Sequence, residues 1–358
     1  MSSKSNRQNW RLFRHLPLGV KQVVLLSTLA ILVAGCRKEE KAADVPQPAP
    51  VVTEVVALNA QQQFDTLLPA GNYSGIAHLG GDLYALVDDK SATVGFRVVE
   101  LHFDASGRIA SLADSGFRSS GMTNADAEGV AFFTPAGTVF IACEGDNSVR
   151  EYRLDGSPTG RTLPTAGIFP TNGNIGIESL TYNAETHHFW TTTEGTLSAD
   201  GAASSPTNGL PCTLRLQAYD DDLMPSGQWI YRTDTPVTDT VDGTYVFGVS
   251  DLCALDDGRL LVMERESHIP SLAFGAFVTN KIYLVDPSST SQGDTLDKRL
   301  LTSFRTLIND LTYANYEGIC LGPRLPDGNR LLILVADSQN RYRGVLKDWF
   351  KTIVVQGI

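Results

Sequence analysis

The chain has 358 residues and a formal net charge of −11 at pH 7, from 29 basic and 40 acidic side chains. This balance excludes nucleic acid as the main partner, because binding to a phosphate backbone needs an excess of Lys and Arg. Hydrophobic residues make up 42% of the chain, which is enough for a folded core. The acidic excess suits an exported protein that binds cations, or one that only needs to stay soluble.

The first 35 residues predict a targeting segment rather than part of the fold. Five basic side chains come first, followed by an apolar run, residues 23–33, that is too short to span a membrane comfortably. The run leads into the sequence LVAGC, which resembles a bacterial lipobox in which Cys36 receives the lipid.

We therefore expect three parts: a lipoprotein signal peptide at 1–35, a lipidated Cys36 with a flexible Ala- and Pro-rich tether at 36–50, and one domain at 51–358. This arrangement predicts anchoring in the bacterial cell envelope through Cys36. Because Arg37 rather than Asp follows the cysteine, we expect the outer membrane, facing the periplasm or the exterior, if the host has two membranes.

One sequence phrase recurs five times in the remaining chain. An acidic or polar residue and a small residue open a short apolar strand, and after a turn a second apolar strand ends on a carboxylate. The copies cover residues 73–89, 127–145, 177–195, 250–266 and 316–338. A repeated all-strand unit of about 50 residues is typical of a propeller blade.

Segments with alternating apolar and polar residues follow the copies and supply further strands. They cover residues 95–104 and 108–117, 148–156 and 160–164, 212–220 and 228–233, and 281–287 and 298–304. Only one clear strand, residues 352–358, follows the fifth copy, so we expect residues 51–59 to complete the last blade and close the ring.

The predicted fold is therefore an all-β propeller with five visible four-stranded blades. Six blades are possible if one is degenerate within residues 197–209 or 234–248. A β-sandwich would not repeat its opening phrase five times, and a β-helix needs shorter repeats than these.

The carboxylates of the repeat are expected to crowd around one mouth of the central channel, because the start of a blade's first strand and the end of its second lie on the same face. Those that start first strands are Glu128, Glu178, Asp251 and Glu317, and those that end second strands are Asp88, Glu144, Glu194, Glu264 and Asp337. Crowded like charges raise one another's pKa unless cations bind. Many oxygen ligands without His or Cys favour calcium over zinc, copper or iron. We predict calcium held by these nine residues; the alternative is that they accept backbone N–H bonds and join blades without a metal.

Three residues are the candidates for catalysis. Glu264 or Glu178 is suited to act as a general base, and Arg265 is suited to hold a phosphate through its planar fork. Lys90, Arg341 and Arg343 also follow carboxylates, and an ordinary surface role is the competing interpretation for each. The chain has no G-x-S-x-G motif, so a Ser/His/Asp hydrolase of that type has no support.

Four cysteines remain besides Cys36, at positions 143, 212, 253 and 320. They permit two disulfides, but three of them lie inside strand phrases, where Cys often serves as a small buried hydrophobe. We expect buried thiols.

The motifs together resemble the family described as having the esterase-like activity of phytase. They are DAEGVA at 126–131, IESL at 177–180, SDL at 250–252, GRLLVMER at 258–265, EGI at 317–319, GPRLPDG at 322–328 and the aspartate at 337, within roughly residues 70–345. The resemblance implies a β-propeller, found in exported and often lipid-anchored bacterial proteins, that hydrolyses phosphate or carboxylate esters. The resemblance implies that the acidic positions and Arg265 belong to the site, but it identifies no nucleophile. In the first repeat, Ser74 stands where the other repeats have an acid.

Three functions follow from these patterns. The first is a calcium-dependent hydrolase acting on a small anionic ester. The alternative is a non-catalytic ligand- or protein-binding propeller of the cell envelope, because a fold alone does not separate binding from catalysis. A third hypothesis is a lactonase-like propeller with one catalytic metal, for which Asn124, Asn147, Asn315 and Asn340 lie near the motifs.

Overall fold

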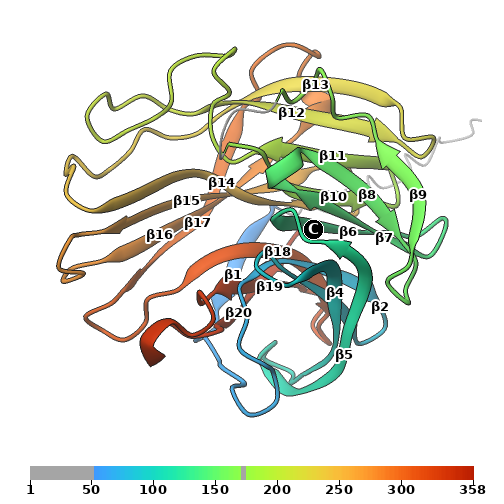
Figure 1. Ribbon diagram of the computed structural model, residues 1–358, viewed down its shortest axis with the longest axis horizontal. Helices are drawn as coiled ribbons and strands as arrows, with labels where there is room; N and C mark the ends of the chain where they lie inside the picture. The colour runs from blue at the N-terminus through green and yellow to red at the C-terminus, as the bar shows by residue number, and fades with distance from the viewer. Residues whose placement is uncertain (1–51, 171–174) are drawn as a thin grey trace, which may run out of the picture. The chain divides into compact units, whose positions relative to one another are not determined.

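The computed structural model of the protein describes residues 52–170 and 175–358. These residues form five four-stranded antiparallel sheets arranged as the blades of a β-propeller (Figure 1). The predicted fold class and the count of five blades are therefore confirmed. The predicted signal peptide, the lipidated cysteine and the tether lie outside the described residues.

Within each of four blades, the chain runs from the innermost strand to the outermost. The strands are β2 (Tyr73–Gly80), β3 (Leu83–Asp88), β4 (Thr93–Phe103) and β5 (Ile109–Thr123); β6 (Ala127–Phe133), β7 (Thr138–Cys143), β8 (Ser148–Tyr152) and β9 (Pro158–Leu163); β10 (Ile177–Asn183), β11 (His188–Thr193), β12 (Thr213–Asp220) and β13 (Pro225–Arg232); β14 (Thr244–Ala254), β15 (Leu260–Ile269), β16 (Phe277–Val285) and β17 (Lys298–Leu307). Three short 3₁₀ turns, Glu144–Asp146, Pro287–Ser289 and Tyr342–Gly344, complete the regular structure of the described residues.

The fifth blade is built from both ends of the described chain. It contains β18 (Asn315–Arg324), β19 (Arg330–Asp337), β20 (Phe350–Gln356) and, at its outer edge, β1 (Glu54–Leu58). β1 pairs with β20 in antiparallel register, so the predicted closure of the ring is confirmed. Residues 197–209 and 234–243 connect strands and carry no sixth blade.

Every innermost strand contains a β-bulge close to its start. Pairing with the second strand skips Ser74 in β2, Glu178 in β10, Ser250 in β14 and Glu317 in β18, and in β6 the irregular step includes Glu128 and Gly129. Bulges re-aim side chains and are common beside functional sites. The acid of the sequence phrase thus marks an irregularity in the sheet, and not a regular strand position.

Small residues beside the bulges let neighbouring innermost strands approach closely. A Cβ at Gly129 would lie 2.5 Å from the backbone nitrogen of Leu180, and one at Gly75 would lie 2.3 Å from the carbonyl oxygen of Glu128. Such contacts are far too short for any larger residue. These glycines therefore hold the first three blades tightly around the channel.

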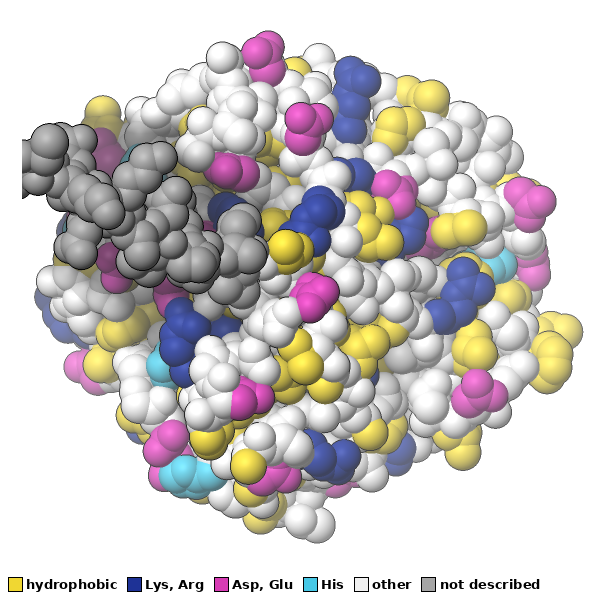
Figure 2. All heavy atoms as spheres, turned by 180° about the vertical axis from the view of Figure 1, so that it is seen from behind, with side chains coloured by type: hydrophobic (Ala, Val, Ile, Leu, Met, Phe, Trp, Pro, Cys, Tyr) yellow, Lys and Arg dark blue, Asp and Glu magenta, His cyan; other side chains and the backbone are white. Residues whose placement is uncertain are grey.

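The four cysteines of the described chain, Cys143, Cys212, Cys253 and Cys320, are buried free thiols, as the strand phrases predicted. None of the helical turns in the described residues is long and apolar enough to cross a membrane. Figure 2 shows acidic, basic and apolar side chains interspersed over the part of one face that the described residues form.

Candidate functional site at the channel mouth

Two positions in each blade face the same mouth of the channel. The first is the bulged residue of the innermost strand: Ser74, Glu128, Glu178, Ser250 and Glu317. The second directly follows the second-strand residue that pairs with the residue before the bulge: Asp89, Glu144, Glu194, Arg265 and Asp337. The described mouth therefore combines seven carboxylates, one arginine and two serines.

Three of the nine predicted ligands lie outside this arrangement by a single residue. Asp88, Asp251 and Glu264 each stand next to the residue that occupies the mouth position, which is Asp89, Ser250 or Arg265. Successive residues of a strand point to opposite faces, so a shift of one residue sends the side chain to the other side of its blade.

Glu264 illustrates the consequence for a predicted catalytic residue. Its carboxylate accepts hydrogen bonds from the hydroxyl of Tyr231 at 2.7 Å and the backbone N–H of Asp234 at 3.1 Å, and it pairs with Lys298 at 2.6 Å. These partners belong to the outer strands of its own and the preceding blade. Glu264 is thus part of an ionic cluster between two blades, apart from the channel mouth.

Asp251 and Asp88 also have local roles. Asp251 is buried and accepts the backbone N–H groups of Leu252 and Ile319, both at 2.8 Å, which ties two blades together. This is the metal-free role that the sequence left open, and the structure supports it for this residue. Asp88 accepts the backbone N–H of Lys90 and lines a separate pocket with Tyr73 and Arg97.

Arg265 is the centre of one charged network at the mouth. Its side chain is buried and forms ion pairs with Glu194 of one neighbouring blade and Glu317 of the other. Asn315 accepts a hydrogen bond from Arg265 at 3.0 Å and donates one to Glu317 at 2.7 Å. Burial opposes the guanidinium charge, but Glu317 and Glu194 outweigh it and raise the pKa of Arg265. Arg265 therefore compensates two of the seven carboxylates.

Lys90 compensates a second group. Its ammonium nitrogen lies 2.6 Å from Asp89 and 2.5 Å from Asp126, a carboxylate that comes directly before β6. Asp89, Asp126 and Glu128 bring one oxygen each within 4.8 Å of one another. The side chain of Lys90 is 60% exposed, so the ammonium reaches this cluster from the solvent side.

Glu128, Glu144 and Glu178 form a third group, which no cationic side chain of the described residues pairs with. One oxygen of each lies within 4.8 Å of the others. Glu144 accepts the backbone N–H of Gly176 at 3.2 Å. Glu128 and Glu178 are each only 7% exposed, and among residues 52–170 and 175–358 neither carboxylate has a hydrogen-bond partner. Leaving largely buried carboxylates in this state is costly, and a bound proton or cation would relieve that cost.

The pKa shifts of these carboxyl groups reflect the same cost of burying neighbouring negative charges. Burial, with Glu178 and Glu317 nearby, raises the pKa of Glu128 well above its usual value. Burial and the charge of Glu194 do the same for the pKa of Glu178. Burial also raises the pKa of Glu144 to about 7 and, against the effect of Arg265, that of Glu317 to about 7. Glu144 and Glu317 therefore exchange protons near neutral pH, and at each of the four carboxyl groups a cation would compete with the proton.

The remaining predicted residues take other roles. Asp337 accepts the backbone N–H of Gln339 at 2.6 Å, and burial together with Glu317 raises its pKa. Arg341 pairs with Asp348 and donates to backbone carbonyls, while Arg343 is exposed.

The asparagines proposed for a lactonase-like metal site do not gather in one place. Asn124 donates to the backbone carbonyls of Asp88 and Asp89, and Asn147 accepts the backbone N–H of Ile177. Of the four asparagine side chains, only that of Asn315 donates a hydrogen bond to a carboxylate of the mouth, that of Glu317.

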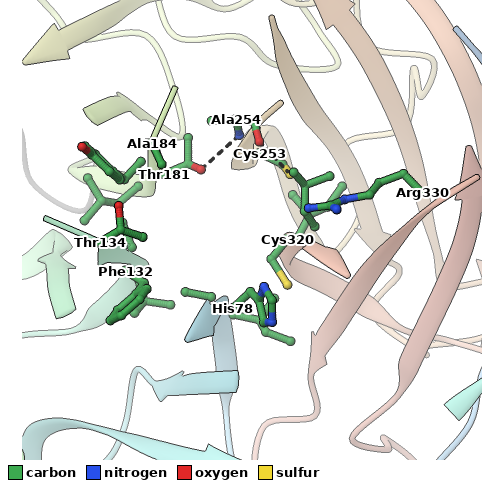
Figure 3. A pocket seen from close by; sticks show the side chains of 17 residues that line it. His78, Phe132, Thr134, Thr181, Ala184, Cys253, Ala254, Cys320 and Arg330 are labelled. Carbon is green, nitrogen blue, oxygen red and sulfur yellow. Dashed lines mark hydrogen bonds between the residues drawn. The ribbon is translucent and has the colours of Figure 1, made fainter. Parts of the chain in front are cut away.

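The opposite end of the channel has a different character. A cavity of about 150 Å³ opens there between the later halves of all five innermost strands (Figure 3). Its lining includes His78, Cys253, Cys320 and Arg330, and none of the described residues that line it carries a carboxylate. The converging carboxylates of the described residues thus lie at the other mouth and not around this cavity.

The sequence analysis did not predict that Asp89 and Asp126 lie at the mouth, or that Lys90 pairs with both of them. It also did not predict that Arg265 takes a position that a carboxylate occupies in the other blades. The missing signal was the bulge, which shifts each mouth position by one residue relative to a regular strand. Its only trace in the sequence is the small residue next to the acid.

Comparison with known proteins identifies one family. The phytase-like family, described as "Esterase-like activity of phytase", matches residues 68–339. None of the curated proteins compared matches the chain.

The solved structures that the chain is similar to are distant. The chain is similar to a structure described as a nidogen/laminin complex at 11% identity, covering 78% of this chain and 83% of that chain with a TM-score of 0.41. It is similar to a streptogramin B lyase structure at 12% identity, covering 83% and 98% with a TM-score of 0.35. A protein of Bacteroides thetaiotaomicron matches at 10% identity, covering 86% and 76% with a TM-score of 0.37. Likenesses at this level support no conclusion about this chain.

Proposed function

The chain belongs to the phytase-like family, and from that premise we propose that it is a calcium-dependent hydrolase of phosphate or carboxylate esters whose site is the acidic channel mouth. The observation that carries the proposal is the group Glu128, Glu144 and Glu178. These three carboxylates converge, and two of them are nine-tenths buried without a hydrogen-bond partner in the described chain. Such a group is suited to hold a cation.

Calcium fits this donor set better than other metals. Three carboxylates offer up to six oxygens, and calcium takes six to eight oxygen ligands in flexible geometry. The group contains no His or Cys, which disfavours zinc, copper and iron. When bound, calcium would supply positive charge that attracts an anionic ester and lowers the pKa of a bound water.

The other roles at the site belong to side chains of the protein itself. Glu144 is less buried than Glu128 and Glu178, so a cation held by the three carboxylates would be open to water and substrate on the side of Glu144. Glu178, predicted as a base from the sequence, is buried deeper and suits cation binding. Arg265 already bonds Glu194 and Glu317, so it positions these carboxylates and is not free to clamp a phosphate.

We also propose that the protein works as a lipoprotein of the bacterial cell envelope, anchored through Cys36 and carrying its substrate site in the propeller. The support is the order of basic segment, apolar run and LVAGC in the sequence. Its proposed partners are a small anionic ester and the membrane.

A non-catalytic binding propeller is the second candidate, favoured by one specific observation. Asp251 and Arg265 show that acidic and basic groups near the mouth join blades to one another. A cation at the mouth would then stabilise the ring and present a ligand surface.

Assays of ester hydrolysis by the purified protein distinguish the hydrolase from the non-catalytic binding propeller. The substrate panel contains phytate, p-nitrophenyl phosphate and short-chain p-nitrophenyl carboxylates, each assayed with calcium and with EDTA. The hydrolase predicts turnover that EDTA abolishes and calcium restores. Glu178→Gln should lower that turnover, while Glu100→Gln, on β4 and paired with His102 away from the mouth, should not. Calcium-stabilised protein without turnover on any substrate would support the binding propeller.

A further inference from the structure

The cationic side chains are distributed unevenly around the channel mouth. Arg265 compensates Glu194 and Glu317, and Lys90 compensates Asp89 and Asp126. The two acidic clusters that share Glu128 therefore differ in charge. We name Asp89, Asp126 and Glu128 the outer triad, and Glu128, Glu144 and Glu178 the inner triad.

The outer triad already contains a cation. The ammonium of Lys90 bridges two of its carboxylates at 2.6 and 2.5 Å. Burial disfavours the charged form of Lys90, but the hydrogen bonds that its ammonium donates to Asp126 and Asp89 outweigh this effect and raise the pKa of Lys90. Lys90 therefore stays protonated over the whole physiological range.

The inner triad has no such partner among the described residues. Among the described residues, the one hydrogen bond to a side chain of this triad is donated by the backbone N–H of Gly176 to Glu144 at 3.2 Å. Glu128 and Glu178 are buried to the same extent, with 7% exposure each. Two unpartnered and nearly buried carboxylates aimed at one point are a second observation, beyond the clustering, that points to a ligand there.

We infer that the inner triad binds a single divalent cation, and that the ammonium of Lys90 occupies the outer triad in place of a second one. The inference rests on the proposed cation dependence of this site and specifies it further. Lys90 thus sets the number of cations at the mouth.

The outer triad retains oxygens that would serve a second cation if Lys90 were removed. Oδ1 of Asp89 and Oδ1 of Asn124 are buried without hydrogen-bond partners in the described chain. Asn124 also lies against Asp89, because its amide donates to the carbonyl of that residue at 2.9 Å. Removing the ammonium leaves three converging carboxylates with Asn124 beside Asp89, a set of oxygen donors suited to calcium.

The test is the calcium stoichiometry of the purified protein, measured by isothermal titration calorimetry at pH 7.5. The expected result is one calcium ion per chain for the wild type and two for Lys90→Met. Lys90→Arg keeps the positive charge and should bind one. Adding Asp126→Asn to Lys90→Met should remove the second site and leave the first. Glu178→Gln should weaken the wild-type site by about tenfold or more.

Circular dichroism of each variant confirms that the fold is retained. The inference is overturned if the wild type binds two ions or none, or if Lys90→Met still binds one. The result does not depend on turnover. A chain that binds one ion and hydrolyses nothing would contradict the proposed hydrolase and leave the assignment of the two triads standing.

Discussion

Arg265 shows how one residue organises the mouth. It stands where the other blades carry Asp89, Glu144, Glu194 and Asp337, so one repeat supplies a cation where the other four supply acids. The motif made Arg265 recognisable from the sequence. Its role was not predictable, because its ion pairs join blades that are distant in sequence.

Loss of Arg265 should destabilise the ring. Arg265→Met leaves Glu194 and Glu317, whose side chains are 19% and 12% exposed, without their cation, and breaking a largely buried pair in this way costs about 3 kcal/mol. Urea unfolding without calcium measures the loss. Arg343→Met removes an exposed charge and should change the free energy of unfolding by about 0.5 kcal/mol or less. An unchanged unfolding midpoint for Arg265→Met would contradict the role given to this pair.

Glu178 is expected to destabilise the metal-free protein and to stabilise the protein when calcium is bound. In metal-free protein at pH 8, Glu178→Gln removes one of the mutually repelling buried carboxylates, so the variant should unfold at a higher temperature than the wild type. With calcium the order should reverse, because the variant has lost a ligand. Thermal unfolding with EDTA and with calcium provides both comparisons. The same order in both conditions would mean that Glu178 does not bind the cation.

At the scale of elements, the blades were predictable and the bulges were not. Alternation of apolar and polar residues located most strands, and the unused segment before the first repeat correctly predicted ring closure by β1. The bulges depend on how innermost strands of adjacent blades pack, which one strand's pattern does not encode. For this reason Asp88, Asp251 and Glu264 were assigned to the mouth in place of their neighbours.

The close approach of the innermost strands gives an element-scale prediction. Gly129→Ala places a Cβ 2.5 Å from the backbone nitrogen of Leu180, so β6 and β10 must separate. We expect a loss of several kcal/mol and weaker calcium binding, because Glu128 and Glu178 stand on these two strands. Gly195→Ala is the matched control, since its Cβ would meet Ile175 at an ordinary 3.7 Å. Equal melting temperatures for the two variants would refute this packing argument.

For the whole molecule, the excess of acid at one mouth predicts a pH-dependent stability. The pKa values of Glu144 and Glu317 are about 7 in the folded protein, against an ordinary value of 4.5. The folded chain therefore holds more protons than the unfolded chain between these values, and stability falls as the pH rises through that window.

Thermal unfolding of metal-free protein at pH 5.5 and pH 8 checks this expectation. The midpoint should be lower at pH 8, by on the order of 5 °C. Saturating calcium should reduce the difference, since the cation replaces the proton of Glu144. A midpoint that rises between pH 5.5 and 8 without metal would contradict the charge distribution described for the mouth.

The most direct test of the central claim compares binding with turnover. Calcium is titrated into metal-free protein, once by calorimetry and once while hydrolysis of the best ester substrate is followed. The account predicts that the calcium concentration for half-maximal turnover equals the dissociation constant, and that Glu178→Gln raises both by the same factor. Turnover that is unaffected by calcium, or a half-maximal concentration that does not move with the dissociation constant, would contradict the account.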